Sequence, residues 1–190
     1  MPAEDSGCRN YQGVAWYRKR FKMPATIYAN GKITLQFEAI MGKQDIYVNG
    51  RLVKEHLGGY LPITIDLTAA GVKAGDECLV AVMTDNSDDK SYPPGKKQMT
   101  LDFCYHGGIY RDVWLTEQPA VHITDAVEKG EVAGGGIFVH YANISEKSAE
   151  VYVNTDVENS LGKPQTVTVA NTLLDADGKK VKTWKTKVTV

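Results

Sequence analysis

One short stretch holds more chemically useful side chains than a structural hairpin needs. Residues 102–114 read Asp-Phe-Cys-Tyr-His-Gly-Gly-Ile-Tyr-Arg-Asp-Val-Trp. The Asp102 and Asp112 carboxylates can accept hydrogen bonds from vicinal hydroxyls, and charge-assisted bonds are stronger than neutral ones. Tyr105 and His106 add rings on which an apolar C–H face can rest. This mixture suits a saccharide, so we expect Asp102, Tyr105, His106 and Asp112 to be substrate-binding residues.

Two glycines divide the stretch and suggest how it is folded. Gly107 and Gly108 allow the backbone to turn through positive φ or to approach a ligand closely. A structural interpretation stays open, in which Asp112 pairs with Arg111 or caps a turn and Asp102 merely opens a loop. We expect the Arg111 guanidinium to be buried and to hold the loop together through hydrogen bonds to backbone carbonyls or to a carboxylate. Neighbouring strand residues point to opposite faces, so Arg111 and Asp112 should have different roles.

The two aspartates could also be a catalytic pair, because they are ten residues apart across a glycine turn. Spacing alone leaves this arrangement open. However, raising one carboxyl pKa for acid catalysis requires a dry, apolar pocket, and a surface loop on a sandwich rarely supplies one. We therefore assign no catalytic residue.

Composition narrows the classes of partner. The chain has 22 Lys and Arg residues and 23 Asp and Glu residues, which gives a net charge of −1. It therefore lacks the excess of positive charge that attracts nucleic acid or an anionic membrane. No run approaches the roughly 20 apolar residues that a spanning helix needs. The first seven residues lack the basic start and apolar core of a signal peptide. We expect no nucleic-acid and no membrane partner, and the localisation stays unknown.

The cysteines and histidines do not have the spacing of a metal site, and we expect no cofactor and no metal. Three cysteines contain no Cys-x-x-Cys pair, and we interpret Cys78 as a small buried hydrophobe. The remaining histidines should be satisfied or solvent-facing, and the acidic run before Lys90 should be a solvated loop rather than a calcium site. These residues are His56, His122 and His140, and Asp85, Asp88 and Asp89.

Alternating hydrophobicity predicts strands almost throughout. Ile33, Leu35 and Phe37 alternate with polar residues over 32–38, and similar patterns run over 63–67 and 78–82. Asn49-Gly50 between two apolar runs predicts a tight type I′ hairpin. Trp16, Tyr17 and Phe21 alternate with basic residues, and we expect them to pack in the core although aromatic rings can also stack on sugars. No window has sustained helical periodicity, so the fold class is all-β.

The composition changes near Gln118, where we place a domain boundary. Residues 138–141, 150–157, 166–174 and 181–190 are typical of sandwich strands joined by glycine turns. Trp184, Val188 and Val190 share a parity, so we expect them to face one core. The second region has about 70 residues against roughly 100 for an immunoglobulin-like sandwich, so we expect it to be incomplete.

Four ordered motifs resemble the sugar-binding domain of glycoside hydrolase family 2, which contains β-galactosidases, β-glucuronidases and β-mannosidases. They are Trp-Tyr-Arg-Lys-Arg-Phe at 16–21, Ile-Tyr-Val-Asn-Gly-Arg-Leu-Val at 46–53, Gly-Gly-Tyr-Leu-Pro at 58–62 with Asp-Leu-Thr at 66–68, and Gly-Ile-Tyr-Arg-Asp-Val at 108–113 preceded by Tyr-Pro-Pro-Gly-Lys at 92–96. The resemblance covers roughly residues 16–125. It implies a jelly-roll sandwich of galactose-binding-like topology over 1–118 and part of an immunoglobulin-like sandwich over 119–190.

The resemblance also implies what the chain does. In this family Asp102 matches an aspartate that β-glucuronidase-like members present to the sugar. Asp112 matches a β-galactosidase aspartate at the hydroxymethyl end of galactose. The catalytic glutamates lie on a (β/α)₈ barrel, which takes about 250 residues and is absent from this chain. We therefore predict an inactive, non-catalytic front of a retaining β-glycosidase, β-galactosidase-like, whose partners are a β-linked saccharide and the missing barrel. The alternative is a stand-alone carbohydrate-binding module.

Overall fold

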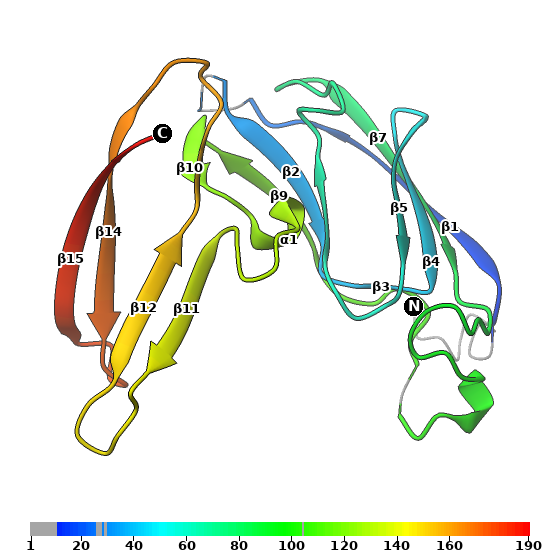
Figure 1. Ribbon diagram of the computed structural model, residues 1–190. Coiled ribbons are helices and arrows are strands. Elements are labelled where there is room, and N and C mark those ends of the chain that lie inside the picture. Colours follow the sequence, from blue (N-terminus) through cyan, green and yellow to red (C-terminus); the bar gives the residue numbers. More distant parts are fainter. Residues whose placement is uncertain (1–10, 26–27, 29, 104) are drawn as a thin grey trace. The chain divides into compact units, whose positions relative to one another are not determined.

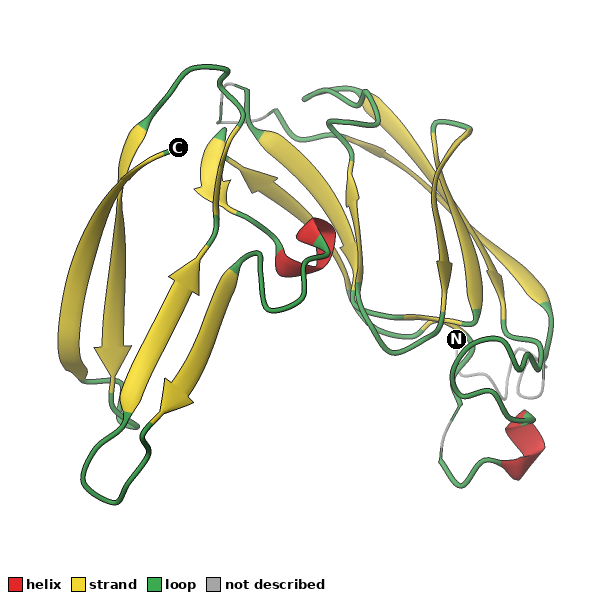
Figure 2. Ribbon diagram, viewed as in Figure 1, coloured by secondary structure: helices red, strands yellow, loops and turns green. Residues whose placement is uncertain are grey.

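The computed structural model describes residues 11–25, 28, 30–103 and 105–190, and most of its regular elements are β-strands (Figures 1 and 2). The predicted all-β class is confirmed. Two short helical turns were not predicted, namely η1 (Gln98–Thr100) and α1 (Ala126–Lys129). The chain divides into two compact units, which we describe separately: unit 1 is Met1–Ile27 with Lys32–Glu117, and unit 2 is Tyr28–Gly31 with Gln118–Val190.

Unit 1 is a β-sandwich with two main sheets. The larger sheet has the order β1-β7-β4-β5, and the smaller has the order β6-β2-β9. A short antiparallel pair, β3-β8, lies outside both sheets. The strands are β1 (Val14–Lys22), β2 (Lys32–Phe37), β3 (Ile40–Met41), β4 (Lys43–Val48), β5 (Arg51–Leu57), β6 (Ile63–Asp66), β7 (Glu77–Asp85), β8 (Gly108–Ile109) and β9 (Val113–Gln118).

The core of unit 1 lies between these two sheets and is built by the predicted alternation. Ile46 and Val82 of the larger sheet and Leu35, Phe37 and Ile63 of the smaller sheet belong to one buried cluster. Cys78, which is fully buried, behaves as the small hydrophobe that we expected. Cys8 and Cys104 lie outside the described residues.

The Asn49-Gly50 hairpin forms as predicted. Both residues have positive φ, 50° at Asn49 and 81° at Gly50, as a type I′ turn requires. The turn is also held by β7, because the Asn49 amide N–H donates to the Leu79 carbonyl and the Asn49 Oδ1 accepts from the Leu79 N–H, each at 2.8 Å. The hairpin therefore fixes where β5 begins, at Arg51.

One detail of the alternation was wrong. We expected Thr34 on a solvent face, but only 4% of its surface is exposed. The face of β2 that carries Thr34 is therefore shielded from solvent like the face that carries Leu35. Thr64 of β6 is likewise buried, and its Oγ1 accepts a hydrogen bond from Gln36 Nε2 at 3.1 Å.

Unit 2 contains three two-stranded antiparallel pairs, β10-β13, β11-β12 and β14-β15. These are β10 (Val121–Ile123), β11 (Ile137–Ala142), β12 (Glu150–Thr155), β13 (Val157–Asn159), β14 (Thr166–Leu174) and β15 (Lys180–Thr189). β11, β12, β14 and β15 fall where the sequence predicted strands, but the predicted strand over 150–157 ends at Thr155, and β13 is a separate strand. Asp125 caps α1 by accepting hydrogen bonds from the backbone N–H groups of Val127 and Glu128, a signal that the hydrophobic pattern does not contain.

Candidate functional site

The predicted site residues lie at one end of unit 1: Asp102, Tyr105 and His106 on the connection between β7 and β8, and Asp112 between β8 and β9. The β7–β8 connection runs over residues 86–107 and carries η1 (Figure 1). Loops longer than about 12–15 residues are uncommon in compact domains and usually functional or disordered. Tyr92, and Tyr60 on the loop after β5, lie near enough to Tyr105 to raise its pKa, and Tyr110 acts on Tyr60 in the same way. We call Tyr60, Tyr92, Tyr105 and Tyr110 the tyrosine cluster.

Tyr105 is the most strongly perturbed member of the tyrosine cluster. Burial, and then the neighbouring Tyr92 and Tyr60 with Asp88 and Asp85, raises the pKa of the Tyr105 hydroxyl to about 12. The hydroxyl therefore stays protonated at every physiological pH. Tyr105 can donate one hydrogen bond to a ligand oxygen, which suits a sugar hydroxyl.

His106 and Tyr110 lie beside each other, with ring centroids 6.4 Å apart and planes tilted by 33°. The Tyr110 hydroxyl donates to the Gly59 carbonyl and so ties β8 to the loop after β5. Arg111 lies over the Tyr110 ring, with Cζ 5.6 Å from its centroid. Arg111 is exposed, so our prediction of a buried guanidinium was wrong; a cation–π contact holds it instead.

Asp102 and Asp112 are both exposed on bends or loops outside the strands. Asp112 precedes β9, where its carbonyl accepts a hydrogen bond from the Glu38 N–H at 3.0 Å. Within the described residues, the Asp112 carboxylate forms no ion pair with Arg111. Neither carboxylate lies in the dry pocket that acid catalysis needs, so the arrangement fits ligand binding better than bond cleavage.

The two glycines of the predicted site are required by close packing. Gly108 has φ of +73°, and a Cβ there would lie 2.0 Å from the Tyr17 Oη. A Cβ on Gly107 would lie 2.5 Å from the Asn86 Nδ2. The expected positive φ is confirmed at Gly108. The close approach seen here is to protein side chains, and a close approach to a ligand stays a prediction.

Asn86 is a site residue that the sequence did not reveal. It is nearly buried, and its Oδ1 accepts from the Gly13 N–H at 2.8 Å while its Nδ2 donates to the Tyr11 carbonyl at 3.1 Å. Gln98 Nε2 donates to its backbone carbonyl. Asn86 thus fastens the start of β1 and η1 to the same point. Its only sequence signal is a polar residue that directly follows a buried strand.

The loop after β5 is held by a second buried polar residue, Gln44. Its Nε2 faces the carbonyls of Ile40, Gly42 and Gly58 at 2.9, 2.7 and 3.0 Å, so its Oε1 must face His56 Nδ1, 2.7 Å away. Nδ1 therefore carries the proton in this contact. Burial, and then the charge of Lys54, lowers the pKa of the His56 ring.

The other histidines and the acidic run have structural partners, as expected. His122 Nδ1 lies 2.8 Å from the Pro119 carbonyl, and the exposed His140 stacks on Tyr152. The acidic run closes turns: Asp85 and Asp89 each accept two hydrogen bonds from the serine two residues on, and Asp88 accepts from the Gln98 N–H. Hydrogen bonds from Ser91 lower the pKa of the Asp89 carboxyl.

The structure corrects the prediction for the first aromatic strand. Trp16 is 51% exposed rather than packed in the core, and its ring lies 5.8 Å from the ring of Tyr47. Arg18 Cζ lies 5.9 Å from the Trp16 centroid. Phe21 does pack against the core. Trp16 points outward because it pairs with Met83, whereas Phe21 pairs with the buried Cys78.

Searches confined to the described residues reveal neither a membrane-length apolar helix nor a group of three or more His, Cys, Asp or Glu side chains placed to bind a metal ion.

Comparison with known proteins gives a consistent match. Residues 1–119 match the sequence model of the sugar binding domain of glycosyl hydrolases family 2. A β-glucuronidase of Formosa agariphila is 31% identical over 180 residues, which are 92% of this chain and 18% of that protein. A β-galactosidase of Thermoanaerobacter pseudethanolicus is 40% identical over 117 residues, 61% of this chain and 15% of that protein.

A solved structure of Bacteroides uniformis β-glucuronidase 2 matches the fold with a TM-score of 0.80 and 29% identity. The match covers 95% of this chain and 20% of that one. The chain therefore spans about a fifth or less of the length of these three proteins, and both activity names occur among them.

Proposed function

Because the chain belongs to glycoside hydrolase family 2, we propose that it is the non-catalytic N-terminal region of a β-glycosidase, whose tyrosine cluster and neighbouring loop contribute to a sugar pocket completed by a (β/α)₈ barrel outside this chain. The observation that carries this proposal is the position of Asp102, Tyr105 and His106 on the β7–β8 connection, with Asp112 directly after β8. The two carboxylates are exposed, and Gly107 and Gly108 are closely packed against protein side chains. A rigid loop with exposed acceptors can orient a sugar without breaking its bonds.

We assign the β-galactosidase-like substrate class to the parent enzyme. In its favour is the 40% identity over 117 residues with a β-galactosidase, higher than the 31% with the β-glucuronidase, although that match is longer. Under this assignment the Asp112 carboxylate accepts hydrogen bonds from the hydroxymethyl end of galactose, and Asp102 contacts the same ring. We further propose that unit 2 is an immunoglobulin-like sandwich that needs more strands.

The test uses the longer glycosidase that contains this chain. Asp102→Asn and Asp112→Asn should each lower kcat/KM for a nitrophenyl β-galactoside by about tenfold or more, because a hydrogen bond to a charged group contributes about 1.5–3 kcal/mol. Asp177→Asn, an exposed aspartate in unit 2, is the matched control and should change nothing. Unchanged kinetics in both site variants would refute the loop's role. Preference for a β-glucuronide would refute only the galactosidase assignment.

A stand-alone carbohydrate-binding module remains the second candidate, and the exposed Trp16–Tyr47 pair favours it because open aromatic faces stack on sugars. Calorimetry distinguishes the two. Glycan binding well below millimolar by the 190-residue chain, abolished in Trp16→Ala and retained in Asp112→Asn, would support the module. Weak or undetectable binding of neutral monosaccharides is the result expected for the glycosidase region.

A further inference from the structure

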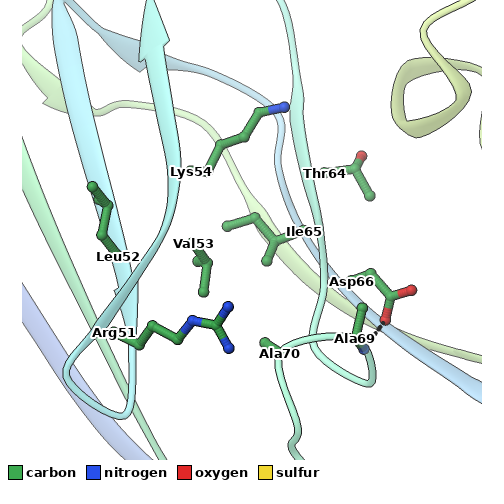
Figure 3. Close-up of a pocket in the computed structure, with 9 residues that line it drawn as sticks. All are labelled: Arg51, Leu52, Val53, Lys54, Thr64, Ile65, Asp66, Ala69 and Ala70. Atoms are coloured by element: carbon green, nitrogen blue, oxygen red, sulfur yellow. Dashed lines mark hydrogen bonds between the residues drawn. The ribbon is translucent and has the colours of Figure 1, made fainter.

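A ligand-sized hollow in unit 1 is lined by none of the residues of the tyrosine cluster. It is a pocket of about 320 Å³ between β5, the edge strand of the larger sheet, and β6, the edge strand of the smaller sheet (Figure 3). Small-molecule sites have volumes of about 300–1,000 Å³, so this pocket fits one compact ligand. It is lined by Arg51, Leu52, Val53, Lys54, Thr64, Ile65, Asp66, Ala69 and Ala70.

The charge of this pocket is unbalanced. Arg51 and Lys54 both come from β5, and within the described part of the chain neither has an ion pair. The one carboxylate of the lining is already engaged: Asp66 Oδ2 lies 3.6 Å from Lys32 Nζ, and Asp66 Oδ1 accepts from the Ala69 N–H at 2.8 Å. Arg51 and Lys54 therefore face the pocket without forming an ion pair to its single carboxylate, Asp66.

The floor of the pocket is apolar and fixed. Ile65 is 5% exposed, and Val53 and Ala70 pack against the core of unit 1. In the close-up, Val53 and Ile65 face each other across the gap, the Arg51 guanidinium reaches toward Ala70, and Lys54 extends on the other side of Val53 (Figure 3). The cationic groups of Arg51 and Lys54 therefore lie on either side of an apolar floor. The floor is held in place by its packing with the core of unit 1.

We propose that this pocket binds a small carboxylate with one apolar face, the chemistry of a sugar acid. Arg51 presents a planar fork that matches a carboxylate with two parallel hydrogen bonds. Lys54 supplies a mobile point charge for a second oxygen of the ligand, and the floor receives the C–H face. The site uses none of the residues of the tyrosine cluster and neither Asp102 nor Asp112, so it is independent of the proposed function.

Calorimetric titration of the 190-residue chain with three probes tests the proposal. The probes are glucuronate, neutral glucose, and cyclohexanecarboxylate, which keeps the charge and the apolar face but lacks hydroxyls. Glucuronate should bind at least about tenfold more tightly than glucose, the ratio that corresponds to one charge-assisted hydrogen bond. Equal binding of both carboxylates indicates that charge and apolar face suffice; preference for glucuronate indicates that hydroxyls are also bound. Either result supports the proposal.

Variants locate the binding. Arg51→Ala should weaken glucuronate binding about tenfold or more, Arg51→Lys should weaken it less, and Lys54→Ala should act in the same direction. Arg20→Ala is the matched control, because Arg20 is an exposed arginine on β1, at the opposite edge of the same sheet. The proposal is overturned if neither carboxylate binds, if glucose binds as well as glucuronate, or if Arg20→Ala weakens binding as much as Arg51→Ala.

Discussion

The two units contain similar strands but bury them very differently. In unit 1 the side chains of Ile40, Ile46 and Leu67 are completely buried. In unit 2 no side chain of residues 137–190, all of which are described, is buried, and Ile137, Tyr141 and Val181 are about 60% exposed, at 59%, 60% and 61%. Alternating strands bury an apolar face only when a second sheet covers it, as in unit 1. Unit 2 has strand pairs without that cover.

The largest effect that separates the units should come from truncating the core. Phe37→Ala in unit 1 should lower the free energy of unfolding by about 3–5 kcal/mol, because it leaves a cavity between two packed sheets. The matched aromatic truncation in unit 2, Tyr141→Ala, should change it by less than about 0.5 kcal/mol. Urea denaturation of both variants measures the difference. Equal losses would show that the two units are packed alike.

Removing the buried amide should have the next largest effect. Gln44→Ala removes the side-chain donor that the Ile40, Gly42 and Gly58 carbonyls share, although the Gly42 and Gly58 carbonyls keep each other's backbone N–H groups. It also removes the partner of the His56 ring, so unfolding should become easier by about 2–3 kcal/mol. Gln12→Ala, at an exposed position, is the control. Amide exchange at Gly58 should also speed up in Gln44→Ala, since the loop after β5 loses its anchor. Unaltered exchange there would contradict the anchoring role.

These buried polar residues also mark the limit of what the sequence could predict. The alternation of apolar and polar residues was sufficient to predict that Leu35 and Phe37 are buried. Asn49-Gly50 was sufficient to predict the hairpin, because both signals are local in the sequence. Thr34, Trp16 and Arg111 were misplaced because their exposure depends on packing between segments that are far apart in the sequence. Gln44 was missed for the same reason: its parity matches Ile46, but its partners come from the ends of other strands. The outcome for the binding roles of Asp102 and Asp112 rests on the kinetics proposed above.

Two glycines give a finer contrast between the units. Gly108→Ala should destabilise unit 1 by about 1–3 kcal/mol, because positive φ and a Cβ 2.0 Å from the Tyr17 Oη act together. Gly178→Ala in unit 2 has a similar φ of +79° but open space, so its cost should be about 1 kcal/mol at most. Thermal unfolding compares them. A larger loss at Gly178 would mean that backbone conformation, not crowding, determines the cost.

The smallest effect concerns alkaline stability. Tyr105 has a pKa near 12 in the folded protein against 10.0 as its ordinary value, so its neutral form is favoured by folding. The stability that it contributes is complete below pH 10 and should be lost as the pH rises toward 12. Burial also raises the pKa of Tyr60 and of Tyr92, but the last phase of an ultraviolet titration of tyrosinate should disappear in Tyr105→Phe and persist in Tyr11→Phe. Loss of the late phase in both variants would contradict this assignment.

The central claim is that this chain orients a saccharide and does not cleave it. Hydrolysis of a nitrophenyl β-galactoside by the purified 190-residue chain, followed over hours at high protein concentration, tests the claim most directly. The account predicts release no faster than in buffer. Turnover that is sustained by the chain and abolished in Asp102→Asn or Asp112→Asn would contradict it, since it would make the exposed carboxylates a catalytic pair.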